Sequence, residues 1–202
     1  MRPPSHSESR RGPSRAIALL AGLLLCAAPR AAPADALKAG VFDPPREAPD
    51  FSLQGSDGKA LTLSRYRGKV VLLGFGYTSC RSVCPVTLAI LAMARRKLGP
   101  LADRAQVIYL TVDPERDDTG RLKRFLASFD ASFIGGTGTV GQMAAVRKSY
   151  GVTAEKIGTG SDYAVAHSSF IYLITREGKL RALMPYGHTA DDFAHDVSVL
   201  LN

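Results

Sequence analysis

The chain has 202 residues, which is enough for one domain of ordinary size. Charged residues make up 22% and hydrophobic residues 46% of the sequence, a balance that excludes a disordered or fibrous protein. The formal net charge is +8, but Lys and Arg are scattered and no basic stripe alternates with aromatic residues. Nothing in the composition therefore indicates nucleic-acid binding.

Residues 1–34 are arranged like a secretory signal peptide. Arginines precede the uncharged apolar run 16–28, and small residues then lead to Ala34 at a cleavage site of the A-x-A type. The apolar run has 13 residues, whereas a spanning helix needs about 20. An uncleaved anchor remains the alternative, and the large Leu25 before Cys26 argues against a lipid anchor. We expect an exported protein, periplasmic or on the outer face of the cytoplasmic membrane.

Residues 35–49 are rich in Pro and Ala and are predicted to be a linker before one domain at 50–202. In this domain, apolar runs that fit strands alternate with periodic segments that fit helices. The predicted strands are a hairpin within 51–63, buried strands at 70–75, 106–112 and 168–174, and an edge strand at 180–184. The predicted helices begin at Cys84 or Pro85, at Asp118 or Thr119, at Thr139 and at Thr189, and end near residues 98, 129, 150 and 201. This alternation predicts an α/β fold with a central mixed sheet flanked by helices and an N-terminal hairpin.

The mature chain keeps two cysteines, Cys80 and Cys84, once Cys26 leaves with the signal segment. A pair this local in an oxidising compartment is typically redox-active or metal-binding. The pair lies between the carboxyl end of a buried strand and the start of a helix, where open α/β sheets place their sites. Unpaired amides and the helix dipole lower a thiol pKa there, so both thiols are expected to be reactive.

The C-x-x-x-C spacing fits two kinds of chemistry. Residues four apart share one helical face with about 5–6 Å between Cβ atoms, so a disulfide is reachable if the backbone adapts. Two thiolates can also share one soft metal ion. A structural zinc site uses four protein ligands, so copper, as Cu(I) or Cu(II), fits two cysteines better. The alternative is an inert disulfide, although so short a loop gains little from closure.

Three sequence blocks carry a recognisable pattern: GFGYTSCRSVCPVTL at 74–88, YLTVDPERD at 109–117 and YAVAHSSFIYLI at 163–174, with GGTG at 135–138 between them. In these blocks the chain resembles the Sco/SenC family, the copper chaperones of cytochrome c oxidase assembly. The resemblance implies a thioredoxin-like fold and a copper site made by Cys80, Cys84 and His167.

The resemblance also implies the partner. This is subunit II of cytochrome c oxidase, whose dinuclear copper centre would receive copper or have its thiols prepared for it. A further expected partner of this chain is a thiol reductant or another copper donor.

Asp113 resembles the family's Asp-Pro-Glu motif and is expected at the same sheet edge as the cysteines. It either orients the site or its partner from the second coordination sphere, or it is a turn residue before a proline. Tyr77 and Thr78 are expected to shape the cysteine loop. Four further residues are expected outside the site: His188 and His195 at the surface, and Met93 and Met143 in the core.

Two enzyme classes compete with a metallochaperone. A peroxiredoxin would have Thr three residues before its reactive Cys, where this chain has Tyr77. A thioredoxin-type reductase would have Trp-Cys-x-x-Cys, and the chain contains no Trp. A periplasmic thiol-disulfide reductase acting on a copper-site protein stays open, because it would use the same cysteines. We expect a chaperone rather than a turnover enzyme.

Overall fold

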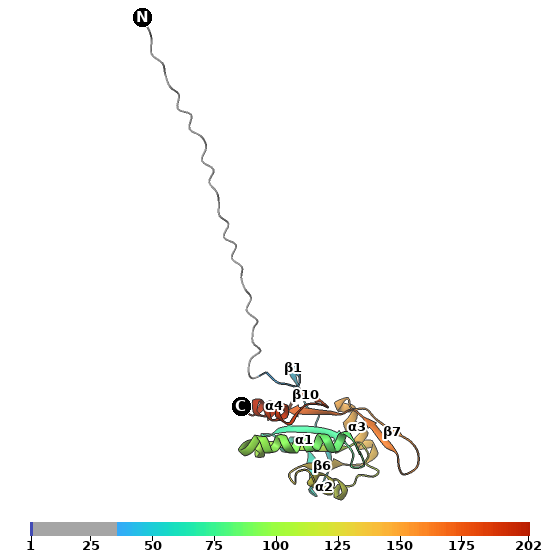
Figure 1. The fold of residues 1–202 in the computed structure, drawn as a ribbon. Helices are drawn as coiled ribbons and strands as arrows, with labels where there is room; N and C mark the ends of the chain where they lie inside the picture. The colour runs from blue at the N-terminus through green and yellow to red at the C-terminus, as the bar shows by residue number, and fades with distance from the viewer. Residues whose placement is uncertain (2–35) are drawn as a thin grey trace. The chain divides into compact units, whose positions relative to one another are not determined.

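The computed structural model describes Met1 and residues 36–202 (Figure 1). The predicted signal peptide lies outside the described residues apart from Met1. Within the described part of the chain, no helix combines the length and the apolar character that crossing a membrane requires.

A mixed sheet of eight strands organises the domain, in the order β1-β10-β9-β4-β5-β6-β2-β3. Three neighbouring strands at its centre, β4, β5 and β6, run parallel, and the remaining pairs are antiparallel. The strands are β1 Gly40–Glu47, β2 Ser52–Gly55, β3 Ala60–Thr62, β4 Val70–Gly76, β5 Ala105–Thr111, β6 Ile134–Thr137, β9 Phe170–Ile174 and β10 Lys179–Pro185. A separate antiparallel pair is formed by β7 Ala154–Ile157 and β8 Ala164–His167. The predicted central mixed sheet is confirmed.

The described residues form four α-helices beside the sheet, and capping side chains mark the start of α2, α3 and α4. The four helices are α1 Val83–Leu98, α2 Thr119–Ala127, α3 Val140–Tyr150 and α4 Ala190–Leu201, with 3-10 turns at Leu63–Tyr66 and Gly99–Arg104. Asp118 accepts a hydrogen bond from the Arg121 amide, and Thr139 and Thr189 each form a reciprocal capping box. These side chains satisfy amides that a helix start leaves free, so the predicted boundaries hold within a few residues.

Helices α1 and α4 pack against each other and against the sheet (Figure 1). Leu72 of β4, Leu91 of α1 and Val197 of α4 line one small cavity between these layers. Tyr150 at the end of α3 contacts the rings of Phe75 and Tyr172, and Phe75 and Leu72 are on opposite faces of the sheet because strand side chains alternate. The central strands β4 and β5 are buried along their whole length, as their continuous apolar runs predict.

Two predictions about the sheet edge are wrong. The segment 35–49 is not only a linker, because its residues Gly40–Glu47 form β1 and pair with β10. Consequently β10 has a neighbour on both sides and is not an edge strand. The side chains of β1 are nearly all exposed and two are prolines, so the segment lacks the apolar alternation that would have indicated a strand.

Further differences have local causes. The short strand β6 contains two glycines and was not predicted, although GGTG was noted as part of the family pattern. The strand predicted at 168–174 begins at Phe170, and His167 closes the separate strand β8. Met143 is fully buried as expected, but Met93 is 45% exposed because it faces away from the buried stripe of α1.

Candidate metal centre

Three chain segments meet at one edge of the sheet. Because β4 and β5 are parallel, Gly76 and Thr111 end their strands side by side, and the cysteine loop and Asp113 follow directly. Strand β9 is antiparallel to β4 and pairs Ile171 with Gly74, so β9 begins at this same edge. His167 comes three residues before β9 and therefore reaches the cysteine loop. The strand order thus brings together residues more than 80 positions apart in the sequence.

Cys84 and His167 are in contact. Cys84 is in the first turn of α1 and is 2% exposed, and its Sγ lies 3.5 Å from His167 Nε2. The other ring nitrogen, Nδ1, lies 2.9 Å from the carbonyl oxygen of Ser168. A carbonyl oxygen only accepts, so Nδ1 carries the proton and Nε2 of the neutral ring presents its lone pair toward the sulfur. This is the orientation that an imidazole ligand needs.

Cys80 occupies a more open position in the loop between β4 and α1. Its side chain is partly exposed, its amide donates to the carbonyl of Tyr77, and its sulfur lies 4.0 Å from the Ser82 hydroxyl. Both cysteines are free thiols in the structure. One sulfur is therefore reachable from solvent and the other is enclosed.

The two thiols differ in acidity. Partial burial raises the pKa of Cys80, but hydrogen bonds from Ser82 and Cys84 outweigh burial and bring that pKa below its ordinary value. Burial raises the pKa of Cys84 to about 12, against a lowering by the Tyr109 hydroxyl and the Tyr77 backbone. The expectation that the helix start would activate both thiols is therefore wrong for Cys84, because desolvation of its charged form is the larger effect. Burial also lowers the pKa of His167, which keeps the imidazole neutral at neutral pH.

The predicted ligand set is only partly assembled in this conformation. Among the described residues, no three His, Cys, Asp or Glu side chains lie close enough together to hold a metal ion. Cys84 and His167 are already in contact, and their sulfur and imidazole nitrogen are donor atoms that copper and zinc bind.

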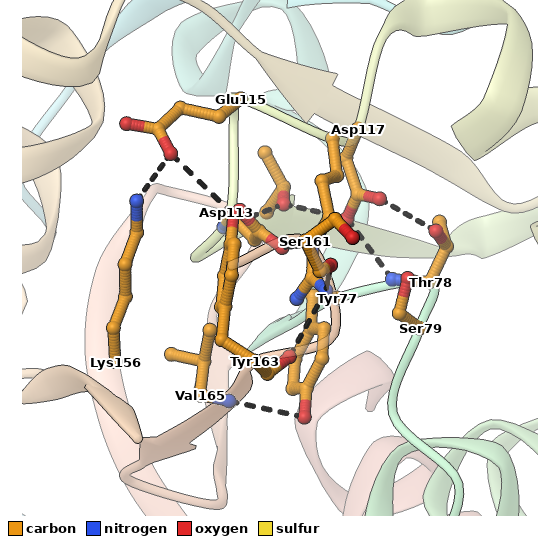
Figure 2. A network of polar contacts seen from close by, with 12 residues as sticks. Tyr77, Thr78, Ser79, Asp113, Glu115, Asp117, Lys156, Ser161, Tyr163 and Val165 are labelled. Atoms are coloured by element: carbon orange, nitrogen blue, oxygen red, sulfur yellow. Dashed lines mark hydrogen bonds and ion pairs between the residues drawn. The ribbon is translucent and has the colours of Figure 1, made fainter. Parts of the chain in front are cut away.

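A polar network joins the β5–α2 loop to the hairpin that carries His167 (Figure 2). Asp113 is 2% exposed, and its carboxylate accepts from Tyr163 Oη at 2.7 Å and from Arg116 Nε. The Arg116 guanidinium also donates to the carbonyl of Tyr163 at 2.9 Å and lies 3.7 Å from the centre of the Tyr163 ring. Asp113 thus contacts Tyr163, the residue before strand β8, and its backbone carbonyl accepts from the amides of Arg116 and Asp117 in a turn.

Tyr77 continues this network toward the candidate ligands. The amide of Val165 donates to Tyr77 Oη at 3.2 Å (Figure 2). The Tyr77 ring meets the His167 ring edge to face, with centroids 6.0 Å apart. A second carboxylate, Asp117, is fully buried and accepts from both the amide and the hydroxyl of Thr78. Sequence reasoning singled out Tyr77 and Thr78 but missed Asp117, although it ends the quoted block YLTVDPERD.

The remaining histidines lie away from this site. His188 is half-buried beside Asp192 of α4, and His195 contacts Asp196 on the same helix. Neither belongs to the candidate site, as predicted, although both are more enclosed than solvated surface residues.

The mixed sheet with α1 following a buried parallel strand, and a cysteine pair at that junction, defines a thioredoxin-like protein with a thiol and imidazole site. The profile of the SCO1/SenC family matches residues 42–202. The chain therefore belongs to the SCO1/SenC family.

Individual relatives agree with this assignment. The chain is 37% identical over 133 residues to the mouse (Mus musculus) mitochondrial SCO2 homolog, covering 64% of this chain and 52% of that protein. The solved structure of Bradyrhizobium japonicum ScoI with copper bound has a TM-score of 0.72 and 36% identity, covering 77% of this chain and 99% of that one. BsSco, described as a member of the Sco family of cytochrome c oxidase assembly proteins and as having a disulfide switch, has a TM-score of 0.65 and 27% identity, covering 81% and 98%. The chain spans about half the length of the first curated relatives it matches.

Proposed function

We propose that this protein is a metallochaperone that binds one copper ion through Cys80, Cys84 and His167. The contact of 3.5 Å between Cys84 Sγ and His167 Nε2 carries the proposal, because it presents a sulfur and an imidazole lone pair to the same point. A relative of the same fold, Bradyrhizobium japonicum ScoI, has been solved with copper bound, which supports copper as the ion.

The chemistry of the three donors fits copper cargo. Two thiolates favour Cu(I), and the added imidazole nitrogen makes the set acceptable to Cu(II) as well. Cysteine binds a metal only as thiolate, so copper entering the site displaces the proton that Cys84 holds tightly in the free protein. His167 arrives already neutral and oriented, with Nδ1 fixed by the Ser168 carbonyl.

The proposed recipient is the dinuclear copper centre in subunit II of cytochrome c oxidase. The family assignment and the description of BsSco as an oxidase assembly protein support this target. The proposed location is the outer face of the cytoplasmic membrane or the periplasm, supported by the sequence of residues 1–34. The mature domain would then meet the oxidase on the side where that centre lies.

A second function, thiol-disulfide reduction of the recipient's copper-binding cysteines, is favoured by the unequal burial of the two sulfurs. Cys80 is partly exposed with a lowered pKa, whereas Cys84 is enclosed behind it. Thiol-disulfide exchange requires an accessible thiolate that attacks the substrate disulfide. It also requires a second, shielded thiol that resolves the mixed disulfide.

Copper loading of the purified domain tests the site. The reduced protein is expected to take up about one copper per chain and the Cys80–Cys84 disulfide none, because the ligands must be free thiolates. Metal analysis after desalting measures both forms. Equal loading of the oxidised and reduced protein would remove these cysteines from the site.

His167→Ala separates the two functions. If the protein works by holding copper, the variant should fail to support copper-site assembly while the purified domain still exchanges disulfides, because the thiols are untouched. His188→Ala is the matched control, since His188 lies outside the site. Oxidase copper content and activity in cells are the measurements, beside an exchange assay. Normal oxidase in the His167→Ala strain would favour the reductase.

A further inference from the structure

Tyr109 has a hydroxyl group that lacks a partner. It lies in the middle of the buried strand β5 and is 1% exposed. Its Oη is one of the buried side-chain atoms for which the described part of the chain supplies no hydrogen-bond partner. Buried hydroxyl groups are nearly always paired, because leaving one unpaired destabilises the fold. A phenylalanine would fill the same space without the free-energy cost of an unpaired hydroxyl. The presence of tyrosine here therefore suggests that its hydroxyl has a role.

The hydroxyl lies close to the sulfur of Cys84. A Cβ atom placed on Gly76 would lie 1.7 Å from Tyr109 Oη and 2.9 Å from Cys84 Sγ, so the two atoms approach each other over the bare backbone of this glycine. Cys84, Tyr109 and His167 also line the same small cavity. Any side chain at residue 76 would collide with both atoms, so their present positions require glycine there.

The chemistry of the pair assigns their roles. A tyrosine hydroxyl ordinarily has a pKa of about 10, so Tyr109 keeps its proton at neutral pH and is a donor. A neutral thiol sulfur is a weak acceptor, so the hydroxyl beside Cys84 gains little from this neighbour in the metal-free protein. A sulfur that carries negative charge accepts much more strongly, because hydrogen bonds to charged groups are shorter and stronger.

We propose that Tyr109 is a positioning residue for copper: its hydroxyl donates a hydrogen bond to the Cys84 sulfur when that sulfur is a copper-bound thiolate. The unpaired hydroxyl of the metal-free protein is then a donor prepared in advance for the charged state. This inference rests on the proposed function, since it requires copper at Cys84. It adds a residue from the buried strand β5 to the set that controls how firmly copper is held.

The proposal makes Tyr109→Phe act in opposite directions on two properties. The metal-free variant should be at least as resistant to heat as the unaltered protein, because an unpaired buried hydroxyl has been removed. Its affinity for Cu(I), measured by competition with a colorimetric chelator, should fall about tenfold, the factor expected for losing a hydrogen bond to a charged group. In the Cu(II) form, the sulfur-to-copper absorption band should move to longer wavelength, because hydrogen bonding stabilises the sulfur electrons that the transition promotes.

Tyr172→Phe is the matched control. Tyr172 is also a buried tyrosine, but its hydroxyl donates to the carbonyl of Tyr150 at 2.6 Å. Its loss should lower the melting temperature and leave copper affinity and the absorption band unchanged. Tyr109→Phe is thus expected to lower copper affinity without lowering heat resistance, and Tyr172→Phe to do the reverse. A general loosening of the core cannot produce this pair of results.

The outcomes separate this inference from the proposed function. If the unaltered protein binds copper and Tyr109→Phe binds it equally well with the same spectrum, Tyr109 only fills space and the inference is overturned alone. If the unaltered protein binds no copper, both fail. The double variant Cys84→Ser with Tyr109→Phe is compared with Cys84→Ser alone. If the double variant still loses copper affinity tenfold, the hydroxyl acts on something other than the Cys84 sulfur, and the inference is overturned.

Discussion

The buried carboxylate of Asp117 accepts two hydrogen bonds from Thr78, one from its amide at 2.9 Å and one from its hydroxyl at 2.5 Å. A third comes from the hydroxyl of Thr111 at the end of β5 at 2.8 Å. Thr78 lies two residues before Cys80, so Asp117 ties the start of the cysteine loop to the neighbouring strand. The loop is therefore held by the protein itself, independently of any bound ion.

Asp117→Ala should destabilise the fold by about 3 kcal/mol, because it leaves a buried amide and two hydroxyl groups without their acceptor. Asp117→Asn should cost only about 1 kcal/mol, since its carbonyl oxygen can still accept from the Thr78 amide and hydroxyl groups can reorient. Urea unfolding of the metal-free protein measures both. Asp162→Asn, at a side chain 94% exposed, is the control and should leave stability unchanged.

Alkylation should distinguish the two cysteines. At pH 8, iodoacetamide is expected to modify Cys80 and spare Cys84 in the folded, reduced protein, because only the thiolate reacts. With a pKa of about 12, Cys84 is thiolate in about one molecule in ten thousand at that pH, and it is also buried. Raising the pH through the lowered pKa of Cys80 should accelerate its reaction until it is fully ionised.

Peptide mapping by mass spectrometry reads the alkylation at each cysteine. The unfolded protein in denaturant is the control and should be modified at both. Equal rates in the folded state would mean that Cys84 is not enclosed as the structure places it.

Arg116→Ala should loosen the hairpin that carries His167. The side chain joins Asp113 to the carbonyl of Tyr163 and stacks on the Tyr163 ring, so its removal opens the contact between the β5–α2 loop and β8. We expect faster amide hydrogen exchange across residues 158–167 and faster release of copper, with exchange in β4 and β5 unchanged.

Arg124→Ala, at an exposed position of α2, is the matched control and should alter neither rate. Unchanged exchange in the hairpin of Arg116→Ala would show that the β7–β8 pairing alone positions His167.

Export should depend on the apolar run at residues 16–28. Placing charged residues between Leu19 and Leu25 is expected to leave the precursor in the cytoplasm, because the apolar core of a signal peptide must be uncharged. Cell fractionation and the size of the product on a gel are the measurements. Normal processing of the charged variant would contradict the signal-peptide interpretation.

The parts of the fold with strong local causes were predictable. Buried strands β4 and β5 appear as continuous apolar runs, and Thr139 and Thr189 mark the starts of α3 and α4 through their capping hydrogen bonds. Strand β1 was missed because its exposed side chains leave no apolar pattern, and only its partner β10 makes it a strand. Pairing between distant segments is a tertiary effect that a local pattern does not record.

At the candidate site, the cysteine spacing and the family resemblance indicated Cys80, Cys84 and His167, but not their environments. The acidity of Cys84 was misjudged because the helix start is visible in the sequence whereas the burial that outweighs it is not. In the sequence, Asp117 looks like an ordinary member of the block YLTVDPERD, and Tyr109 looks like an ordinary residue of a buried strand. Their importance appears only when the fold brings them to the Thr78 amide and the Cys84 sulfur.

Strand β1, which forms one border of the sheet, also bears on how separate copies of the protein behave toward each other. An open sheet border offers amides and carbonyls to the strand of another molecule and can start aggregation. In β1, Pro44 and Pro45 have no amide proton, and the pairing with β10 is irregular between Val41 and Arg46. A strand from another molecule would lack hydrogen-bond donors at these positions, so it would pair poorly with β1. This helps the folded domain to remain dispersed at high concentration.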